Sequence, residues 1–161
     1  MLDLMTPQNV DLLMLLKVTG HALETELSVR LAAVGLTPRA QCVLTNALGG
    51  ERTQSELAEL SNLDKTTMVV TMDALEKAGL AERRLSSTDR RARIIVVTDA
   101  GRDVVAKARQ VVDGLYGEVL GSLPDAQGLV DGLSCLLNGR LAEKVECEHP
   151  PRRRAVKAVV Q

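Results

Sequence analysis

Residues 54–72, QSELAELSNLDKTTMVVTM, form the stretch on which the fold of this chain depends. A helix–turn–helix needs a small residue where its helices touch and, in the turn, a residue that tolerates positive φ. Ala58 and Asn62 stand at those two positions. The apolar residues expected to face inward are Leu57, Leu63, Met68, Met72 and Leu75. The stretch therefore predicts a helix–turn–helix.

Helix-capping residues predict the elements around this stretch. Thr37 and Pro38 suit the N-cap and the first position of a helix. Thr53 and Glu56 have the spacing of a capping box, and Asp64 can cap the helix that follows the turn. The helices predicted before the change of period at Leu80 are residues 8–34, 38–48, 53–60 and 65–78.

From Leu80 onward the pattern changes to that of a β-hairpin. Two strands are predicted over residues 80–85 and 92–98, joined by the polar loop 86–91. Residues 83–93, which include the loop and the adjoining ends of both strands, carry one acid, Asp89, and five arginines: Arg83, Arg84, Arg90, Arg91 and Arg93. An arginine-tipped hairpin beside a recognition helix can enter the minor groove of DNA, where the negative potential favours arginine. A solvated polar turn is the alternative interpretation.

The composition favours a mainly α-helical protein. The chain has 161 residues, of which 45% are hydrophobic and 1% aromatic, with neither Phe nor Trp, so its core is packed aliphatically. Long apolar helices are predicted on both sides of the central module, over residues 8–34, 99–119 and 122–141. A chain of this length offers them too little partner surface, so we infer a two-fold dimer.

Three regions follow from this reading. The predicted winged helix–turn–helix covers residues 36–98, and a helical dimerisation region covers residues 1–35 and 99–147. Residues 148–161 contain a proline pair and a basic run, and we expect a disordered tail there.

Several protein classes are excluded by what the sequence lacks. The net charge is −1, so any surface for nucleic acid must be local. There is neither a bilayer-spanning apolar run nor a basic leader, so we expect no membrane segment and no signal peptide. Cys42, Cys135 and Cys147 form no CxxC pair, which indicates a reducing cytoplasm without a zinc site. Because no catalytic set or phosphate loop is present, we expect neither an enzyme nor a cofactor or metal.

The second helix of the helix–turn–helix offers an outward face near its N-terminus. The predicted members of this face are Lys65, Thr66, Thr67, Val70 and Thr71. Lysine can meet a phosphate, threonine hydroxyls can contact bases or phosphates, and Thr and Val methyl groups can touch a thymine methyl. A recognition helix inserts this end into the major groove. A winged-helix protein-interaction module without DNA binding is the alternative, favoured by Val70 and the near-neutral charge.

Residues 57–84 and 89–101 together resemble the winged helix–turn–helix of MarR-family transcriptional regulators. The short motifs that match are Asp89-x-Arg91 in the wing, Thr98-x-x-Gly101 after it, and Leu36-Thr37-Pro38-Arg39 with Val43-Leu44 in the second helix. The resemblance is motif-specific over residues 36–101 and extends in element order over residues 8–143.

The resemblance implies a homodimer that binds double-stranded DNA at a pseudo-palindromic operator, commonly as a repressor. Each half-site would receive one recognition helix and one wing, with Arg91 in the minor groove and Asp89 orienting it. It also implies a small-molecule effector, often phenolic, bound between the dimerisation and DNA-binding regions. The predicted DNA-contact residues are Arg39, Thr53, Gln54, Ser55, Lys65, Thr66, Thr67, Val70, Thr71, Arg84, Asp89, Arg90, Arg91 and Arg93.

The chain departs from the family pattern at two places. Val69-Val70 stands where many members have Thr-Arg, so base readout is expected to depend more on methyl contacts and wing shape. Gln41 occupies a position that is often aromatic, and the chain has little aromatic material with which to build a stacking pocket. The ligand-pocket candidates are His21, Gln41 and Cys42.

The cysteines leave a further alternative open. We expect Cys42 and Cys135 to be small core residues. Arg39 lies one turn before Cys42 and can lower the pKa of its thiol if both side chains face solvent, so a cysteine-based redox-sensing regulator remains an alternative.

Overall fold

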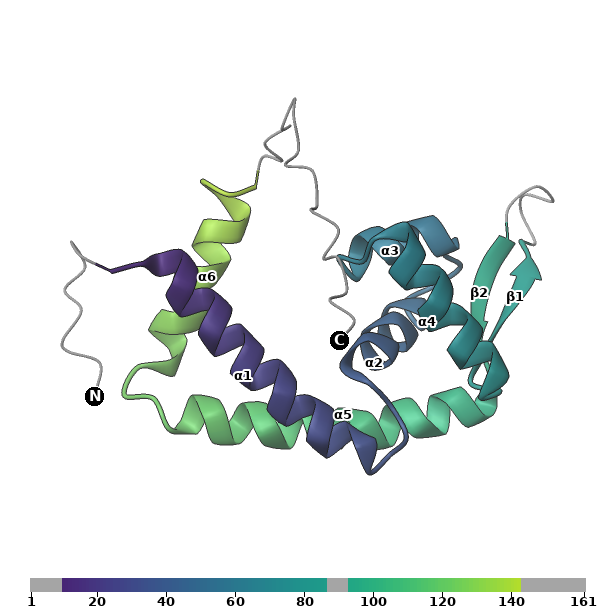
Figure 1. The fold of residues 1–161 in the computed structure, drawn as a ribbon, viewed down its shortest axis with the longest axis horizontal. Coiled ribbons are helices and arrows are strands. Elements are labelled where there is room, and N and C mark those ends of the chain that lie inside the picture. The colour runs from purple at the N-terminus through teal and green to yellow at the C-terminus, as the bar shows by residue number, and fades with distance from the viewer. Residues whose placement is uncertain (1–9, 87–92, 143–161) are drawn as a thin grey trace, which may run out of the picture. The chain divides into compact units, whose positions relative to one another are not determined.

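A computed structural model of the chain describes residues 10–86 and 93–142 (Figure 1). The described part contains a two-stranded antiparallel sheet and is otherwise mainly helical, as the sequence predicted. It divides into two compact units, with the boundary between residues 119 and 120. The elements are α1 (Leu12–Ala32), α2 (Pro38–Ala47), α3 (Gln54–Leu60), α4 (Lys65–Lys77), β1 (Ala81–Leu85), β2 (Arg93–Val97), α5 (Asp99–Gly121) and α6 (Ala126–Asn138).

The predicted capping residues begin the helices of the central module. The Thr37 hydroxyl accepts a hydrogen bond from the backbone N–H of Ala40 at 3.2 Å. Thr53 and Glu56 form the complete capping box, and Asp64 accepts from the N–H of Thr67 at 2.9 Å. Each cap satisfies a backbone donor that lacks a partner in the first turn, which locates the helix start.

The helix–turn–helix turn has the predicted conformation. Asn62 has φ +50°, so the left-handed residue of the turn is the one that the sequence indicated. The N–H of Leu63 then donates to the carbonyl of Ala58 at 2.8 Å, which closes the end of α3. Ala58 is buried where α3 meets the rest of the module.

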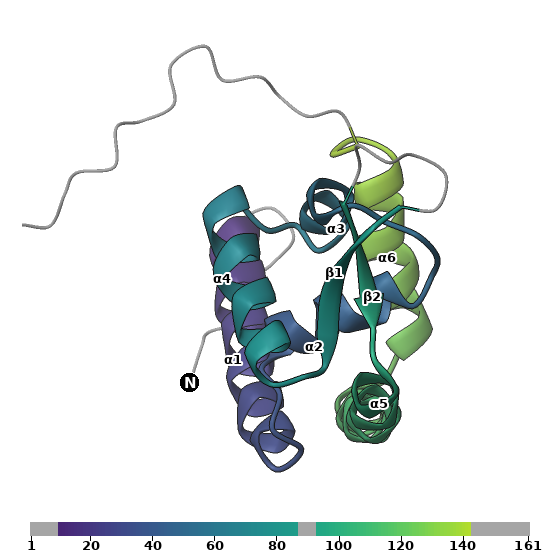
Figure 2. The same ribbon diagram turned by 90° about the vertical axis from the view of Figure 1, so that its right-hand side faces the viewer.

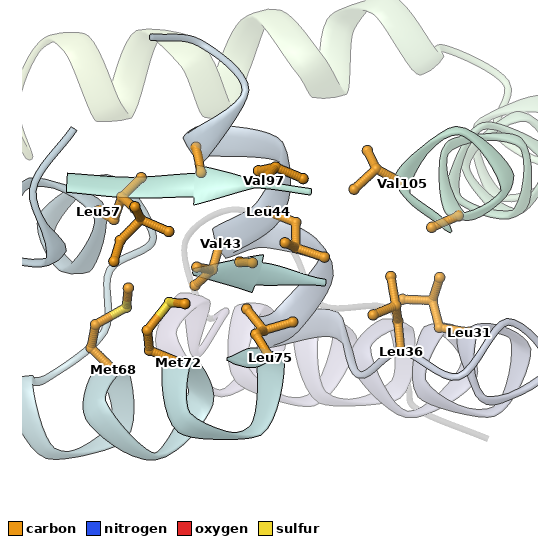
Figure 3. Packing of buried hydrophobic residues seen from close by; sticks show 14 of the residues in the cluster. Leu31, Leu36, Val43, Leu44, Leu57, Met68, Met72, Leu75, Val97 and Val105 are labelled. Atoms are coloured by element: carbon orange, nitrogen blue, oxygen red, sulfur yellow. The ribbon is translucent and has the colours of Figure 1, made fainter. Parts of the chain in front are cut away.

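The core of the first unit is aliphatic and joins all of its elements. In Figure 3, Met68, Met72 and Leu75 point from α4 toward the hairpin and toward α2. The largest fully buried side chains among the described residues of the unit are Leu31, Val43, Leu44, Leu57, Met68, Met72, Ile95 and Leu115. Burial of each leucine or methionine contributes about 1.5–3 kcal/mol, so this cluster holds α4 against α2, α3 and β1.

The wing is anchored at both ends of its strands. β1 pairs with β2 in the register Arg83↔Ile95, and β1 packs against α4 while β2 packs against α2 and α3 (Figure 2). After β2, the Thr98 hydroxyl donates to the carbonyl of Gly79 at 2.7 Å and accepts from the N–H of Gly101 at 3.0 Å. A Cβ on Gly101 would lie 2.0 Å from the carbonyl oxygen of Leu80, so this glycine permits the close approach of α5.

Several predicted boundaries were wrong by a few residues, for local reasons. The first helix begins at Leu12 rather than residue 8, because the Asp11 carboxylate caps it through the N–H of Met14 at 2.9 Å. The last helix begins after its cap Asp125 and is correspondingly shorter than residues 122–141. Leu80 precedes β1 because its N–H completes the end of α4 on Leu75, at 3.0 Å.

The second unit contains α6, in which none of the residues is buried. Within residues 10–86 and 93–142, no helix combines the length and the apolar character that crossing a bilayer requires. The predicted tail, residues 148–161, and Cys147 lie outside the described residues.

Candidate nucleic-acid interface

The outward face of α4 presents part of the predicted contact set. Lys65, Thr66 and Val70 are exposed, whereas Thr67 and Thr71 are half-buried on the flanks of the helix. The Thr67 hydroxyl donates to the Asp64 carboxylate at 2.7 Å, and the Thr71 hydroxyl donates to the Thr67 carbonyl at 2.8 Å. Because both protons are engaged within the chain, these two hydroxyls are left as acceptors, while Lys65 and Thr66 keep free donors.

The first turn of α3 contributes a second row of candidates. The Thr53 hydroxyl donates to Glu56 at 2.8 Å and accepts from its N–H at 3.3 Å, so Thr53 acts as a helix cap. Hydrogen bonds from the Thr53 N–H and hydroxyl lower the pKa of the Glu56 carboxyl. Gln54 accepts from the Arg83 Nε at 3.0 Å, and Ser55 is exposed.

Backbone contacts hold the wing next to α3. The N–H of Ile95 donates to the carbonyl of Arg52 at 2.9 Å, and Thr53 forms an isolated bridge with Ile94. The register pairs Leu85 with Arg93 at the outer end of the ladder. Arg93 is exposed there, while Asp89, Arg90 and Arg91 lie outside the described residues.

Arg83 is one of the five arginines counted toward a basic hairpin, but the structure pairs it with two acids. Its guanidinium forms ion pairs with Glu76 and with Asp73, the latter at 2.8 Å, and its own N–H donates to Glu76 at 2.8 Å. The side chain is only 22% exposed, so this charge is compensated inside the domain. The sequence shows two acids three residues apart, Asp73 and Glu76, on the helix before the strand. It does not show that both carboxylates point toward Arg83.

Arg84 and Arg39 occupy different environments. Arg84 pairs with Glu82 yet remains 61% exposed, so it can exchange that partner for a phosphate. Arg39 is exposed on the first turn of α2 and lines one groove of about 460 Å³ together with Val70 and Thr71. The structure therefore brings Arg39 toward the flank of α4.

A separate cleft of about 500 Å³ lies among α1, α2 and α5 and includes two of the three ligand-pocket candidates. Gln41 and Cys42 line it, whereas His21 is exposed on α1 and is not among the lining residues. Sequence reasoning missed Tyr116, the chain's one aromatic residue, which also lines this cleft. The feature that could have identified Tyr116 is that it is the chain's one Phe, Trp or Tyr residue and lies on the predicted helix 99–119.

The cysteines fit the core prediction incompletely. Cys42 is half-buried, and its Sγ accepts from the Asn46 side-chain amide at 3.6 Å. Cys135 is exposed on α6 rather than buried, because none of the residues of that helix is buried in the single chain. Among the described residues, no group of three or more His, Cys, Asp or Glu is arranged to hold a metal ion.

Comparison with known proteins points to one family. The family model of the MarR family matches residues 34–92. The structure of CouR from Rhodococcus jostii RHA1 bound to p-coumaroyl-CoA is 28% identical over 84% of this chain and 96% of that chain, with a TM-score of 0.74. A MarR family transcriptional regulator from Silicibacter pomeroyi DSS is 29% identical over 86% and 96%, with a TM-score of 0.72.

A second CouR structure, the transcriptional repressor bound to a 23-mer DNA duplex, is 30% identical over 82% of this chain and 92% of that chain, with a TM-score of 0.71. The residues matched by the family model include the helix–turn–helix and β1. The agreement of sequence, fold and coverage leads to one assignment: this chain belongs to the MarR family of transcriptional regulators.

Proposed function

We propose that the protein is a homodimeric, sequence-specific DNA-binding repressor that acts at a pseudo-palindromic operator. The observation that carries the proposal is the outward face of α4, on which Lys65, Thr66 and Val70 are exposed on a helix held by a buried core. A helix so supported can enter the major groove without losing its own packing. The structure of the relative CouR bound to a 23-mer DNA duplex supports the same use of the fold.

The proposed dimer uses the helices outside the winged domain, within residues 1–35 and 99–147. In the single chain these helices expose large apolar side chains: Leu12, Leu13, Met14, Leu15, Leu16 and Val18 on α1, and Leu129, Val130, Leu133 and Leu137 on α6. Exposed apolar surface of this extent is typical of a protein–protein interface. A two-fold partner that buries it would also place two α4 helices for two half-sites.

We further propose that a small-molecule effector releases the protein from its operator by binding the cleft among α1, α2 and α5. Gln41, Cys42 and Tyr116 offer an amide, a thiol and an aromatic ring on its walls. The cleft joins the first helix to the helix–turn–helix through Asn62 and Leu63, so an occupant can shift one against the other. The complex of CouR with p-coumaroyl-CoA supports effector binding in a relative.

A titration of operator DNA at several salt concentrations tests the proposal. Operator sequences come from selection of duplexes with the full chain, and affinity is then measured between 50 and 200 mM salt. A protein that neutralises six to ten phosphates is expected to lose roughly 10³- to 10⁵-fold in affinity over that range. Affinity for duplex DNA that does not change with salt would instead support the protein-interaction module.

Arg91→Ala tests the contribution of the wing. We expect operator binding to weaken by about 1–3 kcal/mol, the scale of one specific contact, while the dimer stays intact. Unchanged affinity in a gel-shift titration would contradict the proposed minor-groove role of Arg91.

A further inference from the structure

The centre of the α4 outward face is apolar. Val70 is 65% exposed and Val69 is 43% exposed, although both follow a helix start that is otherwise polar. At about 100° per residue, Val70 lies roughly 40° around the helix from Thr66, on the side opposite the buried Met68, Met72 and Leu75. Neither valine belongs to the buried core cluster, so their exposed methyl groups are available to a ligand.

Val69 and Val70 differ in what surrounds them. Val69 lines a groove of about 280 Å³ between α3 and α4, together with Ser55 and Lys65. Val70 lies on the other side of the outward face, where it shares the larger groove with Arg39 and Thr71. Val70 therefore has the more accessible methyl groups of the two.

Lys65 and Arg39 are exposed basic groups near the first turns of α4, whereas Arg83, which packs against its second half, is not available to read guanine. A bidentate contact to guanine needs a free guanidinium or ammonium group in the groove. Arg83 is held by Asp73, Glu76 and Gln54 and is mostly buried. The next exposed residue along the α4 face after Val70 is Asp73, whose carboxylate is repelled by DNA phosphates. Base reading by α4 is thus limited to its first two turns.

We propose that Val70 reads the 5-methyl group of a pyrimidine in the major groove, and that each operator half-site carries thymine at the base pair facing it. The inference rests on the proposed DNA-binding function and specifies its sequence chemistry. Thymine is distinguished from cytosine in the major groove by this methyl group and by its O4 acceptor. A valine side chain can contact the methyl group, but it has no donor for a hydrogen bond to O4.

Replacing thymine by uracil tests this inference, because it removes only the 5-methyl group. The full-length protein is titrated against a selected operator and against duplexes in which each half-site thymine is replaced in turn by deoxyuracil. Base pairing and the minor-groove edge stay the same, so wing contacts are unaffected. We expect one position in each half-site at which removal of the methyl weakens binding roughly fourfold, the effect of one buried methyl group.

Two matched variants assign the effect to a residue. Val70→Ala is expected to weaken binding to the thymine operator roughly fourfold and to bind the thymine and uracil duplexes equally. Val69→Ala, the same truncation on the neighbouring position, is expected to keep the uracil penalty. Equal sensitivity to uracil in Val70→Ala and in the unmodified protein would overturn the assignment, as would a penalty lost only in Val69→Ala.

A second pair of duplexes tests whether the methyl group is recognised independently of the rest of the thymine base. At the sensitive position the thymine pair is replaced by cytosine–guanine or by 5-methylcytosine–guanine. Recovery of affinity with 5-methylcytosine relative to cytosine supports recognition of the methyl itself, and its absence overturns it. Specific, salt-dependent binding with no uracil effect at any position would remove this inference alone, whereas absence of specific DNA binding would remove the proposed function as well.

Discussion

The winged region and α6 use apolar residues in opposite ways. In the winged region, Leu57, Met72 and Val43 are completely buried within one chain. On α6, Leu129, Leu133 and Leu137 recur at a spacing of four residues and are all exposed. Both regions have the periodicity of amphipathic helices, but only the first finds its partner surface in its own chain.

This difference separates two kinds of stability. The winged region is specified locally by caps, a left-handed turn and a closed core, so its stability is expected to be independent of protein concentration. The apolar faces of α1 and α6 are expected to become ordered against a second copy, which makes their contribution dependent on concentration. The proposed surfaces for DNA reading and for assembly are therefore separate.

The largest expected effect comes from the core of the winged region. Leu57→Ala removes a fully buried side chain and is expected to lower the free energy of unfolding by about 2–5 kcal/mol, through lost burial and the cavity left behind. Leu60→Ala on the same helix is the control, because Leu60 is 50% exposed and should cost less than about 0.5 kcal/mol. Chemical denaturation checks both values. Equal costs would contradict the distinction between a closed core and an open face.

The next effect concerns assembly. Leu133→Ala is expected to raise the dimer dissociation constant by roughly tenfold or more, because it removes one leucine from each protomer and a leucine buried at an interface contributes about 1.5–3 kcal/mol. Leu48→Ala is the matched control, because Leu48 is 38% exposed and Leu133 is 37% exposed, but Leu48 lies in the winged region. Sedimentation equilibrium measures both. If the two variants dissociate alike, α6 does not form the interface.

A smaller loss of stability is expected at the contact between β1 and α4. Arg83→Met removes the partner of Glu76 and Asp73 and is expected to destabilise the hairpin by about 1 kcal/mol. Amide hydrogen exchange in β1 and β2 reports this loss locally. Arg84→Met should leave exchange nearly unchanged, because its ion pair with Glu82 is exposed and such pairs contribute little.

Most of the fold was predictable because its signals are local. Thr37, Thr53 and Asp64 marked helix starts, and Asn62 marked the turn, since each acts within a few residues of its own position. The start of α1 was less predictable, because the apolar pattern begins before the residue that caps the helix, Asp11. Membership of the MarR family also agrees with the expectation that the chain is a regulator and not an enzyme.

The candidate site was predictable only in part. The spacing of apolar residues identified the outward face of α4, because buried positions recur every three to four residues along a helix. It could not show that Arg83 turns inward to two acids, since that depends on how a strand packs across a helix. The same limit explains why Tyr116, distant in sequence from Gln41, was not assigned to the cleft.

The smallest expected effect is a pH dependence where α1 meets α5. Arg30 donates to Glu118 at 2.6 and 3.0 Å and to Glu26 at 2.6 Å. Hydrogen bonds and charge attraction from Arg30 lower the pKa of the Glu118 carboxyl. A lowered folded-state pKa means that the pair stabilises the fold above the ordinary glutamate pKa, about 4.3, and that this stability is lost as the pH falls through the lowered value.

Glu118→Gln isolates this contribution from other carboxylates, including Glu56, whose pKa is also lowered. The unmodified protein should exceed the variant in stability near pH 7; the difference should begin to shrink near the ordinary glutamate pKa and vanish once the pH is below the lowered pKa of Glu118. Asp113→Asn is the control, because Asp113 pairs with Arg109 within α5 and joins no second helix. Thermal melts at several pH values, repeated at high salt, measure the difference. A difference that persists at low pH would show that Glu118 acts through packing, and that charge does not join α1 to α5.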